Sequence, residues 1–229
     1  MRSMGNRCRL RTAICHRNNS AHNPPTFRLP RDLEERRGEI IRLALTVAGQ
    51  EFEDYRFEFE EWPDIKKGTP CGQVPVLEVD GKQMNESIAI ARYIAKIYDL
   101  GGKDAYEQYL IDRVLGAVDD LYCKARQPWF AEQDQSKKIE LERELYSEHL
   151  PRFLGMFKKY LKDSGGDGKF FVGDSVTLAD LAVHDILTTF LQRNERLLEA
   201  YPELISNRIA TEALPKLAAY LAKRPKCDL

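Results

Sequence analysis

Sixteen residues in the first half of the chain decide its fold: Gly72-Gln73-Val74-Pro75-Val76-Leu77-Glu78-Val79-Asp80-Gly81-Lys82-Gln83-Met84-Asn85-Glu86-Ser87. Val76 and Val79 favour a β-strand. Asp80-Gly81 can adopt the two positive φ angles of a tight hairpin turn, so the strands on either side of it should pair. The stretch is therefore predicted to form an antiparallel hairpin that leads into a helix at Ser87.

Both ends of this hairpin are suited to holding a ligand. Pro75 stands where a strand begins, and an X-Pro bond at such a corner favours the cis form. That corner would turn the Val74 backbone outward, toward an extended ligand that pairs with it like an added strand. At Ser87, the free N–H groups of a helix start favour a carboxylate. The alternative is a hairpin and a helix with no ligand, in which Ser87 only lies near the cap.

Composition narrows the class of protein. The chain has 229 residues, 43% of them apolar, and a net charge of -1, which allows one large domain or two small ones. No basic stripe is interleaved with aromatics, so we expect small-molecule partners and no nucleic acid. No apolar run approaches the roughly 20 residues that span a bilayer, so no membrane association is predicted.

The cysteines give no sign of a metal or of disulfides. No two of the five cysteines form a C-x-x-C pair, and their distances in sequence from the four histidines do not match those of metal ligands. Reduced thiols in a cytoplasmic protein are the simplest interpretation.

The first 31 residues differ in composition from the rest, with seven arginines and no acidic residue. They show no hydrophobic period, so we expect residues 1–25 to be disordered or to reflect an atypical start of the reading frame. An organelle transit peptide is the alternative.

From residue 26 to residue 98 the pattern predicts a small α/β layer. A helix begins near Glu39 and ends at Gly49 in a left-handed cap. Tyr55, Phe57 and Phe59 alternate with charged residues, as in a half-buried strand. With the hairpin and a helix over residues 87–97, the layer still needs one strand, for which Thr26–Leu29 is the only candidate.

Residues 98–104 are predicted to be a linker, and residues 105–229 to be helical. Pro202 and Pro215 are placed to start two short helices. The strongest helix start is Thr177-Leu178-Ala179-Asp180, where the hydroxyl and the carboxylate can form a capping box. We therefore interpret Asp180 as structural.

Several motifs, in order, resemble those of a cytosolic glutathione transferase of the sigma class, from Arg37 to the end of the chain. They are Arg37 to Leu43, Trp62 with Lys66, Gly72 to Leu77 with Glu86-Ser87, Ser175 to Asp180, and Lys223-Arg224-Pro225. The resemblance implies an α/β thioredoxin-like N-terminal domain and an all-α C-terminal domain.

The resemblance also implies a glutathione site. Trp62 and Lys66 would bind the glycyl carboxylate through an indole N–H and an ammonium. The Val74 backbone, before a cis Pro75, would pair with the cysteinyl unit, and Gln73 would add an amide. The family's Gln-Ser pair for the γ-glutamyl carboxylate is Glu86-Ser87 here, and Glu86 can only accept, from the ligand's α-ammonium. Asp120 would reach that ammonium across a homodimer interface, unless it belongs to a solvated helix face.

The chain departs from the family at the group that activates sulfur. In sigma-class proteins a tyrosine hydroxyl at the end of the first strand donates a hydrogen bond to the glutathione sulfur. This bond favours the thiolate form of a thiol whose pKa is otherwise about 8.5. No tyrosine precedes Tyr55 here, and the expected position falls near Arg31 or Arg28. A cation close to the sulfur could also lower its pKa, but nothing in the sequence fixes either side chain there.

The resemblance implies an enzyme that conjugates glutathione, as co-substrate, to small electrophilic hydrophobic compounds in detoxification, without a metal. Prostaglandin isomerisation or peroxidase activity would be a side activity. The alternative, favoured by the missing tyrosine, is a non-catalytic glutathione-binding or structural member of the family.

Overall fold

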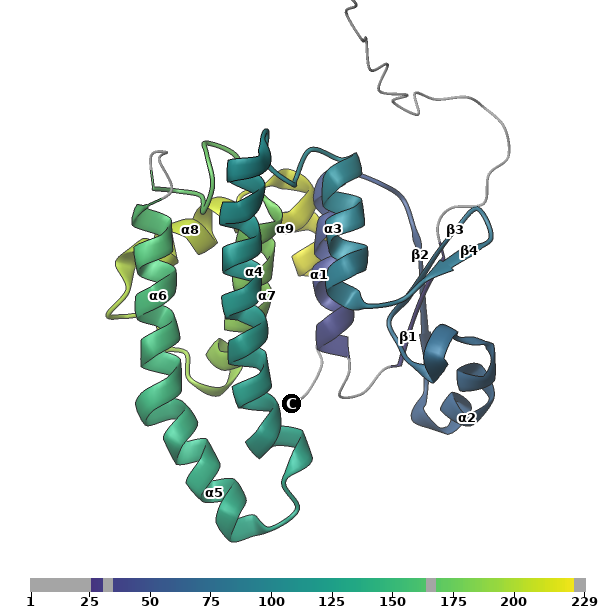
Figure 1. The fold of residues 1–229 in the computed structure, drawn as a ribbon, viewed down its shortest axis with the longest axis horizontal. Coiled ribbons are helices and arrows are strands. Elements are labelled where there is room, and N and C mark those ends of the chain that lie inside the picture. The colour runs from purple at the N-terminus through teal and green to yellow at the C-terminus, as the bar shows by residue number, and fades with distance from the viewer. Residues whose placement is uncertain (1–25, 31–34, 164–167, 225–229) are drawn as a thin grey trace, which may run out of the picture.

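The computed structural model describes residues 26–30, 35–163 and 168–224. It has a small sheet with two long helices at one side and a helical bundle beside them (Figure 1). The first part contains β1 (Thr26–Pro30), α1 (Glu35–Ala48), β2 (Glu53–Phe57), α2 (Trp62–Ile65), β3 (Val76–Val79), β4 (Lys82–Met84) and α3 (Ser87–Ile97). The second contains α4 (Ala105–Arg126), α5 (Gln135–Glu144), α6 (Leu150–Lys162), α7 (Leu178–Arg193), α8 (Pro202–Glu212) and α9 (Pro215–Lys223).

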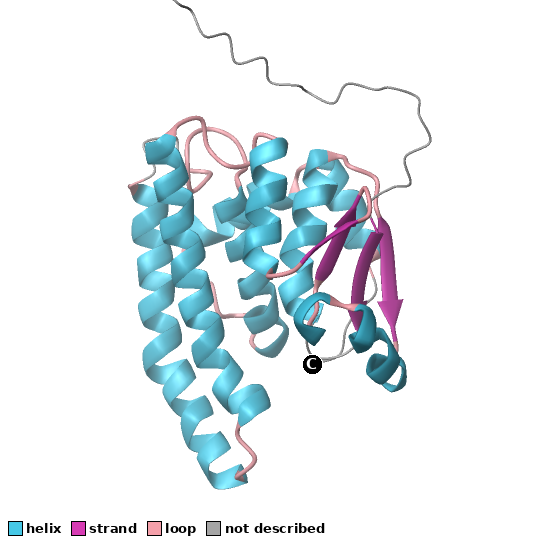
Figure 2. Cartoon of the chain, turned by 45° about the vertical axis from the view of Figure 1, so that its right-hand side comes forward, coloured by secondary structure: helices cyan, strands magenta, loops and turns pink. Residues whose placement is uncertain are grey.

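The sheet has the order β2-β1-β3-β4. β1 runs parallel to β2 and antiparallel to β3, and β3 pairs antiparallel with β4. The weak candidate strand at Thr26–Leu29 is therefore confirmed as β1, in the middle of the sheet (Figure 2). The predicted hairpin is confirmed as well, with φ of 51° at Asp80 and 74° at Gly81.

Helices cover both faces of the sheet. Leu77 packs in the main core with buried residues of α1 and α3, such as Leu43 and Ile94. On the other face, Val74 and Val76 pack with Phe57, Trp62 and Ile65. This arrangement of helices around a mixed sheet confirms the predicted thioredoxin-like fold.

The strand predicted around Tyr55 is shifted. β2 ends at Phe57, and Phe59 already belongs to a short 3₁₀ turn. Phe57 is buried beneath Trp62, whose ring stacks on it at 5.8 Å, but Tyr55 is 38% exposed. The predicted half-buried face is wrong at Tyr55 because α2 covers only the Phe57 end of this edge strand.

The second half is helical, as predicted. The capping box at the start of α7 is present, and α8 and α9 begin at Pro202 and Pro215. α1 packs against α7 and α9, which joins the sheet layer to the bundle. The boundaries of the two domains, 26–98 and 105–229, stay predictions, and residues 1–25 lie outside the described part.

Candidate functional site

Strand register gathers three parts of the chain at one end of the sheet. Leu77 pairs with Met84, so the antiparallel hairpin carries residues 85–87 back toward the level of Val74 and Pro75. Arg28 pairs with Val76, so β1 ends at Pro30 at the same edge. The Val74–Pro75 peptide bond is cis, as predicted.

Trp62 and Lys66 lie beside the start of the hairpin. Trp62 shares an apolar cluster with Val74. The Lys66 side chain passes close to Gly72, since a Cβ built on Gly72 would lie 3.1 Å from its Cε. Lys66 is exposed, so its ammonium can reach a ligand near the exposed Gln73. The structure thus brings together Trp62, Lys66, Gln73, Val74 and Pro75.

Ser87 and Glu86 stand at the start of α3. Ser87 is 4% exposed and opens the helix, while Glu86 is exposed and caps it with a φ of 68°. A positive φ is uncommon for a residue other than glycine, and such conformations concentrate at functional sites. The backbone therefore turns sharply where the γ-glutamyl group is predicted to bind.

Ser87 also lines a pocket between the sheet layer and the bundle. Its walls are the beginning of α1, the beginning of α3, the middle of α4 and one side of α7. Ile40, Ile88, Val118, Ala182 and Ile186 make the lining largely apolar, and Arg37, Asp119, Tyr122, Asp185 and Thr189 supply polar groups. An apolar pocket with a few polar groups is suited to a small hydrophobic compound.

Arg37 is the cation of this pocket. Its Nη2 lies 3.6 Å from Asp119 Oδ1, and its guanidinium lies over the Tyr122 ring at 4.5 Å. Both charged side chains are partly exposed, at 37% and 51%, so this ion pair is screened and weak. The guanidinium therefore keeps donors that a bound anion can use.

Sequence reasoning missed this pocket cation. In the sequence, Arg37 enters only as part of the family-like segment from Arg37 to Leu43, and Tyr122 is not singled out. The one available signal is that Tyr122 lies three residues after Asp119, which places both on one side of the helix. A pocket shared between α1 and α4, however, depends on tertiary packing that the spacing does not encode.

The other candidates stand as follows. Asp120 is exposed on α4 and does not line the pocket, so its role across a dimer interface stays a prediction. The side chain of Arg28 is not described, and Arg31 lies outside the described residues. Trp129 packs in the bundle, with its ring centroid 5.0 Å from that of Phe190.

Among residues 26–30, 35–163 and 168–224, no three His, Cys, Asp or Glu side chains gather where they could hold a metal ion. In the same residues, no helix is both long and apolar enough to cross a membrane.

Comparisons with known proteins identify the family. The model of the glutathione S-transferase N-terminal domain matches residues 33–96, and that of the C-terminal domain matches residues 119–224. Hematopoietic prostaglandin D synthase of Mus musculus is 40% identical over 193 residues, covering 84% of this chain and 94% of the relative.

Solved structures agree in fold. Rat hPGDS complexed with a quinoline has a TM-score of 0.80 at 36% identity and covers 90% of this chain and 100% of that one. Monomeric Na-GST-3, a glutathione S-transferase from Necator americanus, has a TM-score of 0.77 at 31% identity, with 90% and 100% covered. The chain therefore belongs to the glutathione S-transferase family.

Proposed function

We propose that the chain conjugates glutathione to small electrophilic hydrophobic compounds, as a sigma-class member. The observation that carries the proposal is the position of Ser87, which opens α3 beside the hairpin and also lines the apolar pocket. A ligand held along Val74 and Ser87 would thus face the pocket directly. Glutathione is the co-substrate, and the electrophile occupies the pocket.

The binding half of the proposal is tested with Ser87→Ala. Removing the hydroxyl from the γ-glutamyl carboxylate should weaken glutathione binding about tenfold in calorimetry. Ser136→Ala, an exposed serine on α5, is the matched control. No heat of binding for the unmodified chain at millimolar glutathione would reject the proposal.

We propose that a cation replaces the missing tyrosine hydroxyl. A guanidinium near the sulfur favours the thiolate, as the hydroxyl would. Arg37 is suited to this role because it lines the same pocket as Ser87. Arg37→Met should therefore lower the rate of conjugation of a chlorodinitrobenzene about tenfold or more, with glutathione binding retained.

A non-catalytic glutathione-binding protein is the second candidate, and the missing tyrosine favours it. The two candidates separate when glutathione binding and turnover are measured together, because this candidate binds without turnover. Arg31→Tyr or Arg28→Tyr, at the two positions where the family's tyrosine is expected, would then create turnover, and Arg196→Tyr, at an exposed arginine, serves as the control for an added tyrosine. If neither Arg31→Tyr nor Arg28→Tyr creates turnover, the tyrosine is not what the chain lacks.

Prostaglandin isomerisation is a further proposed activity, because relatives carry the name prostaglandin D synthase. This reaction needs the same activated thiolate, so it is measured on the unmodified chain and on the arginine variants described above. Peroxidase activity is measured on the same proteins. We include a cytoplasmic location, which the free thiols of Cys71 and Cys123 support, and a role in detoxification, which follows from the conjugation of electrophiles.

We propose a homodimer in which Asp120 of the partner subunit meets the ligand's α-ammonium. The exposed position of Asp120 on α4 supports this. Sedimentation at micromolar concentration tests the dimer, and Asp120→Asn should weaken glutathione binding only if the dimer forms. A monomer would contradict the proposed homodimer, and the hookworm structure is an example of a monomeric relative.

A further inference from the structure

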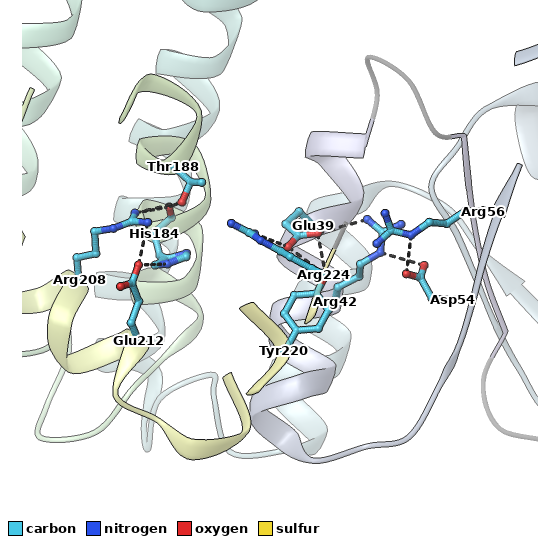
Figure 3. A network of polar contacts seen from close by, with 10 residues as sticks. All are labelled: Glu39, Arg42, Asp54, Arg56, His184, Thr188, Arg208, Glu212, Tyr220 and Arg224. Atoms are coloured by element: carbon cyan, nitrogen blue, oxygen red, sulfur yellow. Dashed lines mark hydrogen bonds and ion pairs between the residues drawn. The ribbon is translucent and has the colours of Figure 1, made fainter. Parts of the chain in front are cut away.

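Helix α9 holds α1 through one carboxylate. Arg224, directly after α9, donates from Nη1 to Glu39 Oε1 at 2.7 Å. The Tyr220 hydroxyl lies 3.1 Å from each Glu39 oxygen. Figure 3 shows both side chains converging on Glu39. Residues 181 and 185 positions apart in the sequence are therefore fixed to each other.

The contact continues into the sheet. Arg42, which is fully buried, lies 3.4 Å from Glu39 and donates from Nε to Asp54 Oδ1 at 2.9 Å. Arg56 donates to the other oxygen of Asp54 at 2.8 Å (Figure 3). A series of ion pairs thus connects the end of α9 with α1 and α1 with β2. Removing a partner of the buried Arg42 leaves its guanidinium less well compensated.

The ion pair with Glu39 keeps the charge on Arg224. Burial opposes the charge of its guanidinium, but Glu39, together with Tyr220 and Asp185, raises the pKa of Arg224 above its ordinary value. Arg224 and Tyr220 therefore hold Glu39, and with it the first half of α1, against α9.

Helix α1 forms one wall of the pocket and packs against α7, which forms another. Glu39 stands beside Ile40 on α1, and both Ile40 and Arg37 line the pocket. The position of the α1 wall thus depends on how Glu39 is held.

We propose that Arg224 is a positioning residue that holds α1 in place as a wall of the acceptor pocket, and thereby selects electrophiles by size. This inference rests on the proposed function, since it assigns the pocket to the hydrophobic acceptor. Arg224 itself does not line the pocket, so it acts through Glu39.

The test measures pocket width without turnover. The dissociation constants of S-alkylglutathiones with alkyl chains of increasing length are measured for the purified protein, in whichever oligomeric state it has. Each added methylene should tighten binding about fourfold until the pocket is full. In Arg224→Met this gain should fall below about twofold per methylene, whereas binding of glutathione itself changes less than about twofold. Arg224→Lys, which keeps the cation, should retain the gain.

The outcomes separate the two claims. If the unmodified chain binds neither glutathione nor any S-alkylglutathione, the proposed function fails. If it binds them and Arg224→Met shows the same gain per methylene, or loses affinity equally for all chain lengths, the positioning role is overturned. Arg196→Met, an exposed arginine in a surface pair, is the control. Should Arg224→Met not fold, Tyr220→Phe removes one bond to Glu39 and must reduce the gain in the same direction.

Discussion

At the scale of single residues, Glu86 is where this chain differs most usefully from the family pattern. It stands one residue before Ser87, with a backbone conformation that places it at the turn into α3. A carboxylate there repels the ligand's γ-glutamyl carboxylate and attracts its α-ammonium. Which contact dominates decides whether the site accepts a glutathione whose amine is blocked.

We expect the attraction to dominate, because Ser87 and the start of α3 remain to hold the carboxylate. Glutathione should then bind about tenfold more tightly than N-acetylglutathione, and Glu86→Gln should reduce that ratio to about twofold. Calorimetry with both ligands checks this. Glu140→Gln, an exposed glutamate on α5, should leave the ratio unchanged. Tighter binding of both ligands to Glu86→Gln, with the ratio unchanged, would mean that Glu86 mainly repels.

Most of the proposed glutathione residues could be found from the sequence, because they lie in two short segments whose local structure the residues encode. Trp62 and Lys66 share one turn, and Val74, Pro75 and Ser87 flank a hairpin whose register follows from Asp80-Gly81. Arg37 could not be given its place, since its position over Tyr122 joins two helices far apart in sequence.

At the scale of elements, Asp180 joins three segments. Its carboxylate accepts from the Phe171 N–H at 2.9 Å, from the Thr177 N–H at 2.8 Å and hydroxyl at 2.9 Å, and from Asn207 Nδ2 at 2.7 Å. The sequence predicted only the contact with Thr177. The contacts with Phe171 and Asn207 arise when α8 and the loop before α7 pack on the helix start.

Asp180→Ala should therefore cost more than the loss of a helix cap. We expect about 3–5 kcal/mol of unfolding free energy for Asp180→Ala, because four buried donors lose their acceptor, against about 1 kcal/mol for Thr177→Ala. Urea unfolding measures both. Asp174→Ala, at an exposed aspartate, is the control. Equal losses for Asp180→Ala and Thr177→Ala would mean that Asp180 acts only as a cap.

At the scale of the whole molecule, the fold class followed from the order of elements, while the polar contacts between its two parts did not. Glu39, Arg42 and Asp54 look like surface charges in the sequence, yet Arg42 is fully buried. The burial of Arg42 depends on the packing of other elements, α9 among them, around α1, which no local pattern indicates. The same holds for His184 of α7, which is 2% exposed and meets Glu212 of α8 (Figure 3).

Burial of His184 makes stability depend on pH. His184 Nε2 lies 2.9 Å from Glu212 Oε1, which also receives Arg208 Nη2 at 2.8 Å. Burial lowers the pKa of His184 below its usual 6.5, although the bond to Glu212 partly offsets this, and the charges of Arg208 and Arg224 add to the lowering. The unfolded chain therefore takes up a proton near pH 6.5 while the folded chain does not. Stability contributed by His184 is complete above that pH and is lost as pH falls below it.

The unfolding free energy should thus decrease below about pH 6.5 with a slope approaching about 1.4 kcal/mol per pH unit from this group. His184→Gln can still donate to Glu212 but cannot titrate, so its slope between about pH 5 and pH 6.5 should be smaller by that amount. The Glu212 pKa is lowered, first by the His184 hydrogen bond, so its own contribution is lost only as pH falls below its usual 4.5, outside this range. Thermal melting at a series of pH values, with His149→Gln as the control on a partly exposed histidine, measures the difference. Identical slopes for the unmodified chain and His184→Gln would show that another group governs the acid response.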